Sequence, residues 1–324
     1  MIVKPKKMEA EIVALQALLR RLPNNHLKRS QIEKDLAKKL TGFKGEQSME
    51  YYLSFLPDEN YLILHHIRLL GNSHHFQMDI VILSSTFFLI LEVKHISGKI
   101  TFDKDSNQLI RDYNDEIEIF PDPVLQVNHQ RFQLKKWLEN NKFQSIPIET
   151  LVVLTNPSSF IQFTPNSFSY KQTVTRSTNF LSKVNHLSQI YREEKLTKKE
   201  LRKLSKLLLK HHTPKHPDVL QKYNISKSEI LLGVHCPKCF CLPMERKWGK
   251  WLCPKCQTSN KNAQIDTLKD FCLLIKPTIT NKEARKFLKS DSESIVQKLL
   301  IDMNLPYSGT TKGRVYELQF DDWD

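Results

Sequence analysis

Continuous apolar runs, bounded by turn residues, mark the strands of a predicted sheet. Residues 80–83 and 87–91 are uniformly apolar and are separated by the Ser-Ser-Thr segment 84–86. Short apolar runs of this kind are typical of strands that are buried on both faces. Residues 61–64 and 150–155 have a similar character. The sequence therefore predicts a central sheet built from these four segments.

Helical patterns surround these strands. Apolar residues recur at helical spacing over residues 8–21 and 124–140, and a further helix is expected over about residues 45–55. Ser30 and Thr197 are each followed three residues later by Glu, which is the capping-box signature of a helix start. Helices alternating with buried strands predict an α/β fold.

The last sixty residues have a helix, helix, helix, hairpin pattern. Leu268 lies in the first apolar helical pattern, Thr280 caps a second helix and Ser292 a third, and the Gly-bounded turn 309–313 leads into the short strand 314–318. The pattern resembles a winged helix-turn-helix. Binding of DNA and binding of another protein are both open for such a domain.

Composition narrows the class of partner. The chain has 324 residues and a net charge of +14, and basic residues are concentrated between residues 183 and 210. An excess of this size favours a polyanionic partner. No run of about 18 apolar residues exists and no apolar signal segment follows the first residues, so nucleic acid is favoured over a membrane, and a cytoplasmic location is expected. Composition shifts and turn residues divide the chain into N-terminal helices (1–40), a core domain (41–157), a basic helical extension and linker (158–231), a cysteine region (232–261) and a C-terminal domain (262–324).

Four cysteines form two Cys-Pro-Lys-Cys knuckles. Cys236 and Cys239 make the first, and Cys253 and Cys256 make the second. Two such knuckles can provide one tetrahedral set of four thiolates, which suits Zn²⁺ and resembles a small zinc ribbon. A redox dithiol is the less favoured alternative, and Cys241 and His235 are alternative ligands.

Charged residues flank the two predicted apolar strands at their outer ends. Asp79 directly precedes the first strand, and Glu92, Val93 and Lys94 follow the second. Glu92 and Lys94 lie on the same face of a strand because side chains alternate with period two. Buried charges are costly unless they are paired or bind metal. Two carboxylates beside an ammonium can hold Mg²⁺ near a phosphodiester and activate a water molecule.

These residues resemble the PD-(D/E)XK nuclease superfamily and, within it, the nuclease-related domain family called NERD. Residues 42–46 are similar to the family's Gly-x-x-Gly-Glu opening, and residues 120–126 to its Pro-x-x-Gln segment. The resemblance implies a restriction-endonuclease-like αβββαβ core. It also implies that Glu46, Asp79, Glu92 and the Val93 carbonyl bind Mg²⁺ or Mn²⁺. Lys94 would handle the attacking water, and Gln126 would orient Lys94 or a phosphate.

The expected function is therefore that of a metal-dependent nuclease, with DNA the favoured substrate and RNA left open. The alternative is a non-catalytic nucleic-acid-binding or regulatory protein on a nuclease scaffold, since fold alone does not establish activity. His65, His66, His74 and His75 are interpreted as solvated or phosphate-facing imidazoles in preference to metal ligands.

Overall fold

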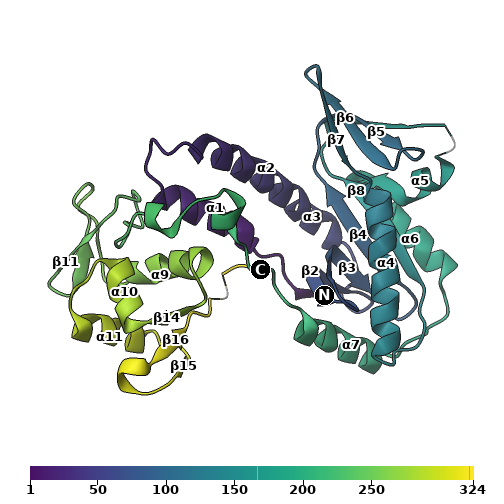
Figure 1. The fold of residues 1–324 in the computed structure, drawn as a ribbon. Helices are drawn as coiled ribbons and strands as arrows, with labels where there is room; N and C mark the ends of the chain where they lie inside the picture. Colours follow the sequence, from purple (N-terminus) through teal and green to yellow (C-terminus); the bar gives the residue numbers. More distant parts are fainter. Residues whose placement is uncertain (166, 321) are drawn as a thin grey trace. The chain divides into compact units, whose positions relative to one another are not determined.

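The computed structural model describes residues 1–165, 167–320 and 322–324 (Figure 1). The chain forms two compact units. The first contains Met1–Lys6 and Leu40–Pro214, and the second contains Lys7–Lys39 and Lys215–Asp324. The fold is mixed α/β, as the alternation of buried strands and helical patterns predicts. In the part of the chain described, no helix is both long enough and apolar enough to cross a membrane.

A six-stranded sheet forms the centre of the first unit. Its order is β1-β2-β3-β4-β8-β10, with bounds β1 (Ile2–Lys4), β2 (Leu62–Leu70), β3 (His75–Leu83), β4 (Phe88–Lys94), β8 (Ile148–Leu154) and β10 (Val174–Arg176). Strands β2, β3 and β4 are antiparallel neighbours. The edge strands β1 and β10, and the pair β4–β8, run parallel. The four strands predicted from the apolar runs are all members of this sheet.

Helices cover both faces of this sheet because its strands are apolar on both faces. Phe88 and Ile90 of β4 pack with α4 (Pro123–Asn140) and α7 (Lys198–His211). Leu89 and Leu91 point the other way and pack with α3 (Met49–Leu53) and α6 (Phe180–Ile190). Parallel strand pairs such as β4–β8 need this cover on both sides. The result is a buried central strand with charged residues at its end.

A second, four-stranded sheet adjoins the core strands. Its order is β7-β6-β5-β9, with bounds β5 (Gly98–Asp103), β6 (Gln108–Tyr113), β7 (Glu116–Pro121) and β9 (Ser159–Phe163). Gly98 has φ +96°, and a Cβ there would lie 2.7 Å from the Asp112 carbonyl oxygen, so a glycine is required. The remaining elements of this unit are α5 (Phe168–Thr173) and the 3-10 turn η1 (Ser177–Asn179).

The prediction of a helix over residues 45–55 is wrong in its boundaries. Helix α2 (Arg29–Gln47) continues through Gly42 and Gly45, and α3 follows after a break at Ser48. Gly45 serves packing and not helix termination, since a Cβ there would lie 2.1 Å from the Cβ of His95. Glu46 therefore lies in the last turn of a long helix and not in the first turn of a short one.

The second unit combines short sheets with helices. Its elements are α1 (Ala10–Arg21), α8 (Val219–Lys222), η2 (Lys227–Glu229), β11 (Glu245–Lys247), β12 (Lys250–Leu252), β13 (Ser259–Asn260), α9 (Ala263–Leu274), β14 (Thr278–Thr280), α10 (Asn281–Leu288), α11 (Glu293–Asp302), β15 (Tyr307–Ser308), η3 (Thr311–Gly313) and β16 (Val315–Glu317). Strands β11, β12 and β13 form one sheet, and the order β14-β16-β15 forms another. Capping boxes are present at Thr197 and Thr280, whereas Ser30, which was also expected to start a helix, lies inside α2, which begins at Arg29.

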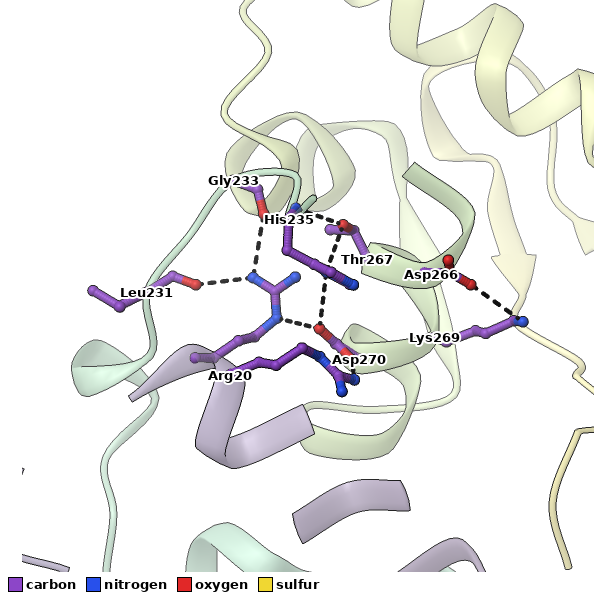
Figure 2. A network of polar contacts seen from close by, with 9 residues as sticks. Arg20, Leu231, Gly233, His235, Asp266, Thr267, Lys269 and Asp270 are labelled. Carbon is purple, nitrogen blue, oxygen red and sulfur yellow. Dashed lines mark hydrogen bonds and ion pairs between the residues drawn. The ribbon is translucent and has the colours of Figure 1, made fainter. Parts of the chain in front are cut away.

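A buried ionic network around Asp270 joins α1 to α9 (Figure 2). Asp270 accepts from Nε of Arg21 at 2.8 Å and from Nη2 of Arg20 at 2.7 Å. Arg21 is fully buried and also donates to the carbonyl oxygens of Leu231 and Gly233. Such a pair is costly to break from one side, because the other charge then stays buried without a partner. The network ties the segment that leads into the cysteine region to both helices.

Candidate functional site

Glu92 is a buried charged residue near the end of β4. Its side chain is only 3 % exposed, and its Oε1 lies 2.6 Å from Nζ of Lys94. Its Oε2 accepts from Nε2 of Gln130 at 3.0 Å. Burial disfavours the charged form of Lys94, but the charges of Glu92 and Asp79 outweigh it and raise the pKa of Lys94. The carboxylate is thus held from two sides and the lysine stays protonated.

Asp79 faces Glu92 from the neighbouring strand. Strands β3 and β4 pair along their length, and the last pair before Asp79 is Ile80 with Leu91. The Asp79 side chain then accepts a hydrogen bond from the backbone N–H of Val93 at 2.9 Å. Burial and the charges of Glu92 and Glu46 raise the pKa of Asp79 well above its usual range, against the opposing effects of Lys94 and the Val93 N–H. The surroundings therefore disfavour the ionised form of Asp79, and a divalent cation bound beside it would favour that form.

Helix α4 brings two glutamines to the site. Its start is fixed by Asp122, whose side chain accepts from the N–H of Val124 at 2.8 Å. Gln126 then lies with its Oε1 3.5 Å from Nζ of Lys94, at the outer limit of a hydrogen bond. Gln130 follows one turn later on the same helix face and reaches Glu92. The sequence predicted the first glutamine and missed the second, although the spacing of four residues was visible.

Glu46 lies beside Lys6 and His66. Its Oε2 forms an ion pair with Nζ of Lys6 and lies 2.6 Å from Nε2 of His66. Burial opposes ionisation of Glu46, but the hydrogen bond from His66 and the charges of His66 and Lys6 outweigh it and lower its pKa. Among the described residues, Glu46, Asp79 and Glu92 do not form a group whose ligand oxygens all lie within 4.8 Å of one another.

The four histidines in and between β2 and β3 separate into two pairs. His74 and His75 are exposed, in agreement with the prediction. His65 and His66 are buried at 0 % and 5 % exposure, so their interpretation as solvated imidazoles is wrong. Burial, together with the charge of Lys6, lowers the pKa of His65 to about 4. Lys6 and His66 were not predicted as site residues, because nothing in the local sequence links them to Glu46.

The four knuckle cysteines form a compact group. One ligand sulfur from each of the four lies within 4.8 Å of the others, and close sulfur pairs join Cys236 to Cys256 at 3.6 Å and Cys239 to Cys253 at 3.5 Å. The N–H groups of Lys238 and Cys256 point at Sγ of Cys236 and Cys253, as the Pro-Lys turns predict. The group could hold zinc, because four thiolates at this spacing are the usual donor set of a structural zinc site.

The two alternative zinc ligands lie outside this group of four. His235 is buried, and its Nδ1 lies 3.2 Å from the Thr267 hydroxyl and 3.4 Å from Oδ2 of Asp270 (Figure 2). Burial lowers its pKa to about 4. His235 therefore belongs to the Asp270 network.

A protein-family match covers the part of the chain that contains the Asp79 and Glu92 carboxylates and Lys94. Residues 41–155 match the nuclease-related domain, NERD. The NERD match spans about a third of the chain and contains all five predicted catalytic residues, but it excludes Lys6 and the cysteine region. Comparisons with curated proteins and with solved structures gave no match.

The match gives the chain a nuclease-related domain, with nucleic acid as the expected class of substrate. The candidate metal ligands of Asp79 and Glu92 are carboxylate oxygens, which suit hard divalent cations such as Mg²⁺ and Mn²⁺. The raised pKa of Asp79, caused by burial and by the charges of Glu92 and Glu46, agrees with such an ion. The cysteine group has the different chemistry of a zinc site.

Proposed function

We propose that this protein is a metal-dependent nuclease that hydrolyses phosphodiester bonds of nucleic acid, with DNA the favoured substrate. The observation that carries the proposal is the convergence of Asp79, Glu92, Lys94 and Gln126 at the end of β4, within the NERD match. Two carboxylates and a protonated lysine are the groups that a metal-assisted phosphodiester hydrolysis requires.

Each residue has a distinct role in this proposal. Asp79 and Glu92, with the Val93 carbonyl, would hold Mg²⁺ or Mn²⁺, and Glu46 would complete the ligand set. When bound, the cation supplies Lewis-acid activation of water and neutralises charge on the phosphate. Lys94, fixed at 2.6 Å from Glu92, orients the attacking water and donates to the phosphate oxygens. Gln126 lies beside Lys94 and would orient it or a phosphate.

The arrangement of core elements supports a restriction-endonuclease-like core. Apart from the short helix α3 and the strands β5, β6 and β7, the order α2, β2, β3, β4, α4, β8 is an αβββαβ sequence, and β4 and β8 are parallel neighbours. In this arrangement the site lies where the antiparallel strands β3 and β4 separate. The small sheet β7-β6-β5 is inserted between β4 and α4.

We also propose accessory roles for the second unit. The cysteine group and the hairpin β11–β12 support a zinc ribbon, and Trp251 packs in its core while Trp248 at the turn is 94 % exposed. The order α9, β14, α10, α11, β15, β16 and the sheet order β14-β16-β15 support a winged-helix-like domain. Its role as a DNA-binding or protein-binding module belongs to the same proposal.

The cationic face of α7 favours nucleic acid as the partner. Leu201, Leu204 and Leu208 pack against the sheet. Beside the capping Glu200, Leu209 and His211, the exposed face of α7 presents six basic side chains: Lys198, Lys199, Arg202, Lys203, Lys206 and Lys210. Among the described residues none of these six makes an ion pair. An unpaired row of charges at this spacing can follow a phosphate backbone. The same surface would serve the alternative function, a non-catalytic nucleic-acid-binding protein.

Cleavage assays separate the two functions. Plasmid, linear duplex and single-stranded substrates are incubated with the full chain in Mg²⁺, Mn²⁺ or EDTA. Asp79→Ala and Glu92→Ala should abolish metal-dependent cleavage and leave binding near wild type, because these residues act on the metal and not on the phosphate backbone. Lys94→Ala should lose turnover and still bind metal. A wild-type protein that binds all three substrates and cuts none with either metal would leave only the binding function.

A further inference from the structure

Lys6, Glu46 and His66 form a contact group that we call the Glu46 arm. The side chain of Lys6 is only 1 % exposed. Its Nζ contacts Oε2 of Glu46 and lies 2.7 Å from Nε2 of His66. The same imidazole nitrogen lies 2.6 Å from the Glu46 oxygen. A carboxylate oxygen and an imidazole nitrogen are both ligand atoms for divalent cations. The ammonium group thus contacts the two atoms that a metal ion would bind.

Hydrogen bonding alone does not satisfy these three atoms. If Nε2 of His66 carries a proton, it donates to Glu46 and then faces the ammonium as donor against donor. If Nε2 carries no proton, it accepts from Lys6 and faces Glu46 as acceptor against acceptor. One of the three contacts is unfavourable in either state. A cation that takes a lone pair from each ligand atom has no such conflict.

The backbone around these residues is built for this arrangement. Strand β1 is a three-residue edge strand that pairs in parallel with β2, and Lys6 follows two residues after its end. His66 lies in the middle of β2 with φ +50°, a left-handed conformation that is strained for a non-glycine residue. Strain of this kind persists where the surrounding structure enforces it, and it is concentrated at functional sites. Here it accompanies the contact between the imidazole and Glu46.

Charge links this arm to the metal site proposed above. The negative charge of Glu46 is one cause of the raised pKa of Asp79, so the two carboxylates interact. When all three carboxyl groups are ionised, Glu46, Asp79 and Glu92 carry three negative charges, against two positive charges on Lys6 and Lys94. Replacement of one ammonium by a divalent cation would balance the cluster. Lys6 is the ammonium better placed to leave, because it follows a short edge strand.

We propose that Lys6 is an internal cation that occupies the metal position of Glu46 and His66, and that a divalent cation displaces it. The proposal rests on the proposed nuclease function and extends its ligand set to His66. Imidazole suits transition metals better than Mg²⁺, so Mn²⁺ is expected to bind at this position more tightly than Mg²⁺. Lys6 then acts as a positioning residue that controls when Glu46 is free to bind metal.

Mn²⁺ binding to the full chain tests the proposal without a cleavage assay. Free Mn²⁺ is measured by electron paramagnetic resonance in titrations of wild type, Lys6→Met, Lys6→Arg and the matched surface variant Lys44→Met. Lys6→Met should lower the Mn²⁺ Kd by roughly tenfold or more, since a competing unit charge next to the ion is removed. Lys6→Arg and Lys44→Met should match wild type. Addition of His66→Ala to Lys6→Met should remove the gain. Equal or weaker binding by a folded Lys6→Met protein overturns the proposal.

Chemical modification provides a second test that needs no substitution. Lysine acetylation of the wild type is followed by mass spectrometry with and without saturating Mn²⁺. Lys6 should be protected in metal-free protein and react roughly tenfold faster or more with Mn²⁺, while the exposed Lys44 is unchanged. Continued protection of Lys6 at saturating Mn²⁺ refutes displacement.

The two proposals fail in different ways. If wild type has no Mn²⁺ site that Asp79→Ala weakens, the metal site of the proposed function is wrong, and the inference about Lys6 is wrong with it. If that site exists but neither Lys6→Met nor acetylation shows competition, only the inference about Lys6 is wrong.

Discussion

Gln130→Met should separate the orientation of Glu92 from the stability of the fold. Gln130 Nε2 donates to Glu92 at 3.0 Å, while its own Oε1 is buried and meets no partner among the described residues. Methionine has a similar volume and no polar group. The substitution loses a charge-assisted hydrogen bond of about 1.5–3 kcal/mol and removes an unsatisfied carbonyl that costs about 1–3 kcal/mol. The free energy of unfolding should therefore change by less than about 2 kcal/mol.

The effect on the metal site should be larger. Glu92 keeps Lys94 as a partner but loses the donor that fixes its second oxygen, so we expect a loss of about 10- to 100-fold in metal affinity or cleavage rate. Mn²⁺ titration, Mg²⁺-dependent cleavage and urea unfolding measure the three quantities on one preparation. Gln133→Met, on the same helix, is the control and should change affinity and cleavage by less than about twofold. A Gln130→Met protein with wild-type affinity and cleavage would refute the orienting role.

Three further predictions concern other parts of the chain. Because the pKa of buried His65 is lowered to about 4, the unfolded state binds a proton that the folded state does not as pH falls below about 6.5, so stability should fall between these values. His65→Leu should remove about 2 kcal/mol of the fall between pH 7 and pH 5 in urea unfolding, and the exposed control His75→Leu should not; an unchanged pH slope in His65→Leu refutes the assignment. The cysteine group should hold one zinc per chain, and Cys253→Ser should reduce the zinc measured by elemental analysis to less than about half an equivalent. Unchanged zinc content would contradict the four-thiolate site. The slope of log K against log salt concentration for duplex binding should become about 2.7 less steep when Arg202, Lys203 and Lys206 are all replaced by Gln. The control protein, with Lys99, Lys104 and Lys142 replaced together by Gln, should show no comparable change. Equal slopes in the two triple variants would exclude α7 as the contact surface.

The strands and the charges at their ends could be predicted because their signal is local. The apolar runs that became β3 and β4 need no information from elsewhere in the chain, and period-two alternation places Glu92 and Lys94 on one face. Their 2.6 Å contact follows from that geometry. The charge of Asp79 next to the first run was visible for the same reason. Local periodicity was therefore enough to predict that Asp79, Glu92 and Lys94 lie close together.

The Glu46 arm could not be predicted because its contacts join distant parts of the chain. Lys6 precedes Glu46 by forty residues, and the edge strand that positions it is only three residues long. The helix expected over about residues 45–55 was also misplaced, since the structure has one continuous helix through Gly42 and Gly45. The close approach of His95 explains Gly45, and this neighbour lies fifty residues away in the sequence.

Burial determines what the lysines of this basic chain can do. The lysines of α7 keep their charges in solvent on a helix whose apolar face is buried, so they can release counterions from nucleic acid. Lys6 and Lys94 are instead largely shielded and bound to carboxylates, so they add little to long-range attraction, and in the proposed function they act on the metal site. Net charge alone does not distinguish the two groups. Substitutions on α7 should therefore change salt dependence without changing turnover, and Lys94→Ala should change turnover without changing salt dependence.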